Sequence, residues 1–178
     1  MTKLLVISDS SSLIIGTKAG LLAALCAEFR VEIPEKVFEE TVVAGKELQK
    51  IDALKIEEAI EKNGIFVKKT KPLKEGKTAE WLSRLNLDEG ETEAIKLYIQ
   101  TNAKLLLADD KQAINAAKLL EINWATIPDI IVEFAERKKI SREKALEALK
   151  TAQTEGRYKI EFILKAFNKI EKIKGGKK

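Results

Sequence analysis

The sequence predicts an α/β sandwich, in which a parallel sheet of four to five strands lies between layers of helices. Short apolar runs alternate along the chain with longer segments of helical composition. Parallel strands need long, right-handed crossover connections, so this alternation favours a parallel sheet covered on both faces. With 178 residues, 45% of them hydrophobic, and only three prolines and nine glycines, the composition is that of one globular domain spanning residues 1–178.

The first third of the chain starts this pattern. Residues 4–8 form a run that is apolar throughout rather than alternating, which is typical of a central strand buried on both faces. The run ends at Asp9, and serine hydroxyls suited to capping precede a helix predicted over residues 11–28. A second strand is predicted at residues 30–33. Pro34 then suits the first position of the next helix, where its missing N–H costs nothing.

Strand and helix continue to alternate up to residue 127. A helix over residues 52–62 ends at Asn63-Gly64, the expected left-handed stop, and the lysine-rich stretch 68–77 indicates an exposed loop. Beyond Pro128 the sequence is helical, giving a C-terminal extension over about 129–173 and a basic tail at 174–178. The remaining predicted elements are strands at 65–68, 105–108 and 124–127 and helices at 78–85, 89–101 and 111–120.

The absence of histidine excludes several classes of active site. Without histidine the chain has no Ser-His-Asp or Cys-His machinery and no histidine general base or zinc ligand. The single cysteine, Cys26, has no disulfide partner within the chain, which favours a reducing, cytoplasmic location. No apolar run suggests a signal peptide or a membrane span, so no membrane partner is expected. Any chemistry must come from carboxylates, lysines or hydroxyls.

Two strands of the predicted sheet end directly on carboxylates. Asp9 follows residues 4–8, and Asp109 and Asp110 follow residues 105–108. Ligand sites in open parallel sheets lie beyond the carboxyl ends of the strands, where the strand order reverses, so we expect these side chains to meet. A simpler interpretation is that each of the adjacent pair, Asp109 or Asp110, caps the following helix. A carboxylate at a buried strand end, such as Asp9, is costly unless it is paired, hydrogen-bonded or bound to a metal.

Two helical glutamates are further candidates. Glu40 lies three positions after Val37, so it sits beside the buried face of its helix and can reach inward. In the helix at 89–101, an apolar stripe leaves Glu93 at its edge, while Glu91 is placed further out. The acidic residues around Glu91 also suit a helix N-terminus, so they have a structural interpretation as caps.

Taken together, these carboxylates indicate a site for a hard cation. Acids that converge without a basic partner raise one another's pKa unless a cation neutralises them. Mg²⁺ and Mn²⁺ take oxygen ligands, and they bind through a few carboxylates together with waters and substrate phosphates. Such an ion lowers the pKa of bound water and stabilises charge on a phosphoryl oxygen. The site therefore suits hydrolysis of phosphodiester bonds.

Four short motifs now give a resemblance to a known family. The order ISDSSSLI, IPEKVFEE, LDEGETEAI and LLLADDK resembles the PIN-domain ribonucleases, and in particular prokaryotic relatives of the toxin type, over roughly residues 3–165. The resemblance implies a Mg²⁺- or Mn²⁺-dependent endoribonuclease acting on RNA. It also implies a homodimer and, for toxin members, an antitoxin protein as partner. The alternative is a PIN-like module that binds RNA or protein without cleaving it.

The resemblance assigns roles to individual residues. It implies that the catalytic residues are Asp9, Glu40, Glu93 and Asp110, and that Ser10 is a supporting hydroxyl beside the first acid. The metal ligands are then Asp9, Glu93 and Asp110, with Asp109 as an alternate, because the adjacent aspartates leave the last ligand ambiguous by one residue. Many relatives have threonine at the position of Ala108.

Basic and aromatic residues outside this cluster remain open to two interpretations. The lysines of the 68–77 loop and the tail suit phosphate contacts but equally suit a solvated surface. Trp81 and Trp124 are suited either to base stacking or to the core. The amphipathic helix around residues 160–170 either covers the core or joins two subunits.

Overall fold

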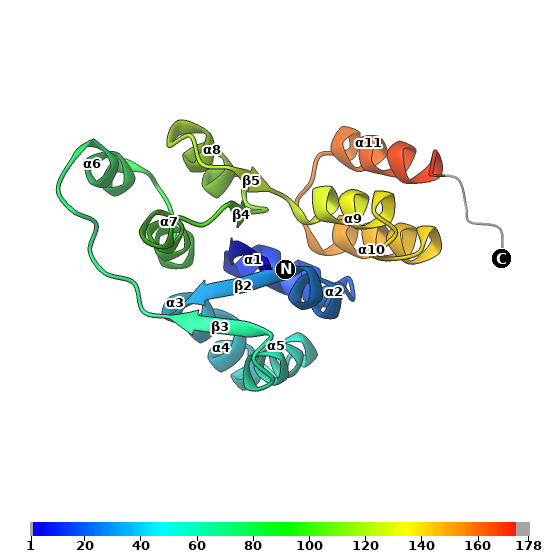
Figure 1. Cartoon of the computed structure of the whole chain (residues 1–178), viewed down its shortest axis with the longest axis horizontal. Coiled ribbons are helices and arrows are strands. Elements are labelled where there is room, and N and C mark those ends of the chain that lie inside the picture. Colours follow the sequence, from blue (N-terminus) through cyan, green and yellow to red (C-terminus); the bar gives the residue numbers. More distant parts are fainter. Residues whose placement is uncertain (1, 174–178) are drawn as a thin grey trace.

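The computed structural model describes residues 2–173, drawn in Figure 1. Its strands form one five-stranded sheet. The spatial order of the strands is β3-β2-β1-β4-β5, and every neighbouring pair is parallel. The predicted α/β sandwich with a parallel sheet is therefore confirmed. The strands are β1 (Leu4–Ser8), β2 (Phe29–Pro34), β3 (Ile65–Lys68), β4 (Leu105–Leu107) and β5 (Trp124–Ala125).

Helices cover both faces of the sheet because successive side chains of the central strands point to opposite sides. Val6 of β1 packs with the helices of one face, and its neighbour Ile7 packs with those of the other. The first face carries α1 (Ser10–Lys18), α2 (Leu22–Glu28), α5 (Ile51–Glu61), α9 (Ile127–Glu136), α10 (Arg142–Glu155) and α11 (Ile160–Glu171). The second carries α6 (Lys77–Arg84), α7 (Glu89–Thr101) and α8 (Lys111–Leu119), which group together in Figure 1.

The helix predicted over residues 11–28 is in fact two helices. Gly20 has a φ of 72°, a left-handed conformation that glycine adopts without steric cost, and its N–H bonds back to the carbonyl of Thr17. The chain therefore turns between α1 and α2, whose axes differ by 115°. Among residues 2–173 no single helix is long and apolar enough to cross a membrane, although this bent pair meets the length and composition test when taken together.

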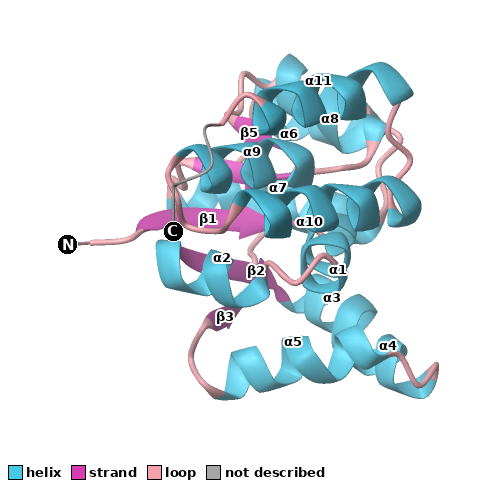
Figure 2. Ribbon diagram, turned by 90° about the vertical axis from the view of Figure 1, so that its right-hand side faces the viewer, coloured by secondary structure: helices cyan, strands magenta, loops and turns pink. Residues whose placement is uncertain are grey.

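The segment after β2 differs from a regular helix. Pro34 ends β2 and forms the N-cap of α3 (Glu35–Phe38), rather than the first helical position. A turn of π-helix, η1 (Glu39–Val43), then separates α3 from α4 (Ala44–Glu47). Figure 2 shows α1, α3 and α4 on the side to which β1 and β2 point. Short π-helical turns are frequent at functional sites, and this one carries Glu40.

The C-terminal part of the chain is helical, as predicted, and its helices share the core of the first sheet face. In α11, Ile163 and Ile170 are buried, whereas Ile160, Leu164 and Phe167 are exposed. One side of this helix therefore covers the core, and the other side is open to solvent. The predicted basic tail at residues 174–178 lies outside the described residues.

Candidate active site

The two acidic strand ends are neighbours in space because β1 and β4 are adjacent in the sheet. Ser8, the last residue of β1, pairs with Leu107, the last of β4, and the N–H of Asp9 donates to the Leu107 carbonyl at 3.1 Å. The chain crosses to β2 on one side of β1 and to β4 on the other, so strand order reverses here. Asp9, Asp109 and Asp110 all line one cavity beyond these strand ends, as predicted.

Asp9 is buried and only half satisfied. Its Oδ1 caps α1, accepting from the N–H of Ser12 at 2.8 Å and from the Ser11 hydroxyl at 3.1 Å. Its Oδ2 is buried without a hydrogen-bond partner, and the side chain is 2% exposed. Burial, reinforced by the negative charge of Asp109, raises the pKa of Asp9 to about 7. Oδ1 therefore caps a helix, whereas Oδ2 lacks a hydrogen-bond partner within the described chain.

Asp109 ties three separate parts of the chain together. Its Oδ1 accepts from the backbone N–H of Ile127, at the start of α9, at 3.0 Å. The same oxygen accepts from the hydroxyl of Tyr158, in the link between α10 and α11. Burial raises the pKa of Asp109, and burial next to this carboxylate raises the pKa of Tyr158, so the phenol stays protonated and donates.

Asp110 caps a helix, which is the structural role that the sequence suggested for either member of this pair. It is the N-cap of α8, and its Oδ1 accepts from the N–H of Gln112 at 2.7 Å. No hydrogen bond to its other oxygen is found among residues 2–173. Because Asp109 is engaged by Ile127 and Tyr158, Asp110 has the freer carboxylate of the two.

The start of α7 also lines the cavity. Asp88 and Glu91 form a capping box, in which Asp88 Oδ1 accepts from the Glu91 N–H at 2.7 Å and Glu91 Oε2 accepts from the Asp88 N–H at 3.1 Å. Glu91 is only 8% exposed. Burial is the main cause that raises its pKa to about 7, with further contributions from Asp88, Asp110 and Asp9. The negative charges of Asp9 and Asp110 therefore act on the Glu91 carboxyl group.

Glu93 lies on another side of the same helix. It lines a separate cavity, where its carboxylate accepts from Lys96 at 2.7 Å and from the Thr70 hydroxyl. Burial alone would raise the pKa of Glu93, but these two partners outweigh it and lower the pKa. Residues two apart on a helix point roughly 200° apart, so Glu91 and Glu93 cannot face the same cavity. The structure therefore brings Glu91, and not Glu93, together with the strand-end aspartates.

Glu40 reaches the edge of the site through Ser10. The Ser10 hydroxyl lines the acidic cavity and donates a hydrogen bond to Glu40 Oε2. The Glu40 carboxylate also packs against Gly90 of α7, where an added Cβ would lie 3.0 Å from the carboxyl carbon and would overlap Oε2. The absence of a side chain at Gly90 thus lets the two elements approach. Ser10, which the resemblance places as a supporting hydroxyl beside Asp9, donates its hydrogen bond to Glu40 in this structure.

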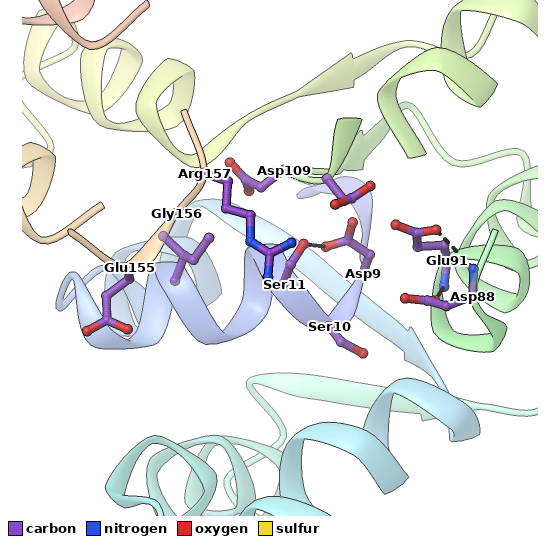
Figure 3. Close-up of a pocket in the computed structure, with 11 residues that line it drawn as sticks. Asp9, Ser10, Ser11, Asp88, Glu91, Asp109, Glu155, Gly156 and Arg157 are labelled. Carbon is purple, nitrogen blue, oxygen red and sulfur yellow. Dashed lines mark hydrogen bonds between the residues drawn. The ribbon is translucent and has the colours of Figure 1, made fainter. Parts of the chain in front are cut away.

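These elements enclose an acidic cavity of about 300 Å³, shown in Figure 3. Arg157, from the link between α10 and α11, is the only basic residue among those of the described chain that line it. The lining residues are Asp9, Ser10, Ser11, Ile15, Asp88, Glu91, Asp109, Asp110, Glu155, Gly156 and Arg157. Within residues 2–173, no group of three or more Asp, Glu or Cys side chains is arranged to hold a metal ion.

The sequence alone does not predict several of these residues as members of the site. Glu91 carried a usable signal, because it lies three and four positions before Ala94 and Ile95, which are buried. Arg157 and Tyr158 carried none, because only the tertiary fold brings the end of α10 to the end of β4.

Comparison with known proteins concerns the chain as a whole. A family model described as PIN domain matches residues 5–172. The chain belongs to the PIN domain family. Among solved structures, it is similar to a PilT N-terminus domain protein from the hyperthermophilic archaeon Sulfolobus solfataricus P2, with 24% identity and a TM-score of 0.46 over 71% of this chain and 89% of that one. No curated protein matches the sequence.

PIN domains are generally nucleases and typically use divalent metal ions. The resemblance seen in the four sequence motifs is therefore confirmed at the level of the family. In this PIN domain, the acidic cavity lies at the ends of β1 and β4.

Proposed function

We propose that this PIN domain is an endoribonuclease that hydrolyses RNA phosphodiester bonds with the help of Mg²⁺ or Mn²⁺. The observation that carries the proposal is the buried, unpartnered Oδ2 of Asp9 within a cavity lined by five more acids, Asp88, Glu91, Asp109, Asp110 and Glu155. A buried carboxylate oxygen without a donor is costly, and a cation removes that cost. Family membership supplies the reaction class.

The donor set fits a hard cation. The cavity offers carboxylate and hydroxyl oxygens but no imidazole or thiolate. Mg²⁺ keeps several waters and needs only one or two protein carboxylates, with substrate phosphates completing its shell. A site of this kind does not require three side chains already converged on one point. Asp9, Glu91 and Asp110 are the residues we propose to hold the ion, with Glu91 replacing Glu93 in the predicted ligand set.

The other residues of the cavity have distinct roles in this proposal. A bound divalent ion lowers the pKa of water and offsets negative charge on the phosphoryl group. Asp109 fixes the end of β4 through its bonds to Ile127 and Tyr158, so it holds Asp110 in place. Glu40 orients the Ser10 hydroxyl at the cavity edge. The raised pKa values of Asp9 and Glu91 mean that protons compete with the ion near neutral pH.

The test is a cleavage assay with a single-stranded RNA labelled at both ends. Wild-type protein with Mn²⁺ is expected to produce internal fragments, and chelator is expected to abolish them. Asp9→Asn keeps the capping oxygen of α1 but is expected to lower the rate by about 100-fold or more, the loss typical of removing one group that stabilises transition-state charge. A DNA strand of the same sequence serves as the control for substrate class.

A matched pair of variants separates chemistry from general charge loss. Glu91→Gln is expected to reduce cleavage as strongly as Asp9→Asn, whereas Glu93→Gln, on the other side of the same helix, is expected to retain it. Circular dichroism of each variant checks that the fold is intact. If the wild type binds RNA equally with and without chelator and never cleaves it, the proposal is wrong and the protein is a non-catalytic RNA-binding module.

A further inference from the structure

The link between α10 and α11 closes one side of the acidic cavity. Glu155, Gly156 and Arg157 line it together with the strand-end aspartates, although about 50 residues of sequence separate them from Asp109. In Figure 3 the Arg157 side chain extends from this link toward Ser11 and Asp9. The C-terminal helices therefore contribute to the cavity as well as to the core.

The link is fastened on both sides of Arg157. Before it, Glu155 forms an ion pair with Lys18 of α1 at 2.6 Å. After it, the Tyr158 hydroxyl donates to Asp109, and the Tyr158 ring packs so closely on Gly156 that an added Cβ there would overlap the ring. These contacts hold the backbone of Arg157 at the cavity edge. Arg157 itself is exposed to solvent.

Arg157 has an unusual electrostatic position. Among the described residues that line the acidic cavity it is the only basic one, yet it forms no ion pair or hydrogen bond with any residue in 2–173. Its five N–H donors are therefore free. A guanidinium beside these carboxylates suits an anionic ligand that also contacts a cation held by the acids. The anion then faces positive charge on two sides.

We propose that Arg157 binds a phosphate of the RNA substrate and so holds the strand over the acidic cavity. The inference rests on the proposed function, since it takes RNA as the substrate of this site. Arginine suits this role because its planar guanidinium donates two parallel hydrogen bonds to phosphate oxygens. The C-terminal helices then have a second task besides covering the core, which is to carry a substrate-binding residue to the site.

The experiment measures binding separately from cleavage. Fluorescence anisotropy of a 5′-labelled single-stranded RNA is recorded over a range of salt concentrations with Asp9→Asn protein, in which cleavage is expected to be about 100-fold slower or more. Adding Arg157→Ala is expected to weaken RNA binding by about 5- to 10-fold. It is also expected to reduce the slope of the logarithm of the RNA association constant against the logarithm of salt concentration by about 0.7, the value for one phosphate contact to a single strand. Arg157→Lys is expected to restore the slope but only part of the affinity.

Lys159→Ala is the matched control, because it removes one exposed positive charge from the same link without touching the cavity lining. It is expected to leave the salt slope unchanged. If Arg157→Ala behaves like Lys159→Ala in both affinity and slope, the inference is overturned, even where the wild type cleaves RNA. If the wild type cleaves no RNA but Arg157→Ala still lowers affinity and slope, the proposed hydrolysis fails while the phosphate contact stands.

Discussion

Replacing Asp9 by asparagine is expected to stabilise the protein in the absence of metal, although it removes a residue of the proposed site. The carboxylate is buried, one of its oxygens has no partner, and Asp109 adds negative charge. Asparagine keeps the oxygen that accepts from the N–H of Ser12, and asparagine is as good a helix N-cap as aspartate. The substitution therefore removes a charge without removing the cap.

The size of the effect follows from the pKa of Asp9, which is raised from 3.8 to about 7. Each pKa unit corresponds to about 1.36 kcal/mol, so ionising Asp9 in the folded state costs at most about 4 kcal/mol above pH 7. A buried amide NH₂ that lacks full hydrogen bonding costs about 1–3 kcal/mol in return. Asp9→Asn should thus raise the free energy of unfolding by about 1–3 kcal/mol at pH 8.

The pH dependence has a defined sign. Between pH 4 and 7 the folded state holds a proton on Asp9 that the unfolded state has lost, so wild-type stability falls as pH rises through this window. The contribution is fully present below about pH 4 and is lost above about pH 7. Asp9→Asn lacks it, so its stability should depend less on pH.

Urea unfolding in chelator, repeated from pH 5 to 8.5, measures both quantities. Glu93→Gln is the control, because its carboxylate is paired with Lys96 and its pKa is lowered, so its removal should be neutral or destabilising. Finding Asp9→Asn less stable than the wild type at pH 8, with an equally steep pH dependence, would show that Asp9 is only a helix cap.

Three further changes probe other parts of the site. Gly90→Ala should push the Glu40 carboxylate away from its present position and lower cleavage several-fold, with a loss of less than about 1 kcal/mol in urea unfolding because the end of a flexible side chain can move. Tyr158→Phe should cost about 1–3 kcal/mol of unfolding free energy, because the Asp109 carboxylate loses the Tyr158 hydroxyl as a hydrogen-bond donor. The apparent Mn²⁺ affinity should rise between about pH 6 and pH 8 as Asp9 loses its proton, and titration calorimetry at each pH would measure this.

Much of the fold could be predicted because its strongest signals are local. The run at Leu4–Ser8 and the pattern of Glu89–Thr101 have the bounds that the sequence indicates. The break at Gly20 was missed because an isolated glycine in an apolar helical pattern does not by itself indicate a turn. The π-helical turn Glu39–Val43 has no recognisable local pattern, because it depends on how the segment packs against its neighbours.

The site was predictable where it follows from strand order and not where it depends on helix phase. Asp9 and Asp110 follow strands, so the rule for parallel sheets placed them together. The apolar stripe of its helix predicts that Glu91 lies further out than Glu93, because an apolar pattern does not indicate a buried carboxylate. Its burial is compensated by the capping box with Asp88, which the sequence suggested only as a cap.

The most direct test of the central claim is the binding of Mn²⁺ to the protein without RNA, measured by electron paramagnetic resonance or calorimetry. The account predicts that the wild type and Glu93→Gln bind the ion with similar affinity. Asp9→Asn and Glu91→Gln are predicted to bind it at least about 10-fold more weakly, as expected when a carboxylate ligand is lost. Equal Mn²⁺ affinity in the wild type, Asp9→Asn and Glu91→Gln would contradict the account, as would a loss of binding confined to Glu93→Gln.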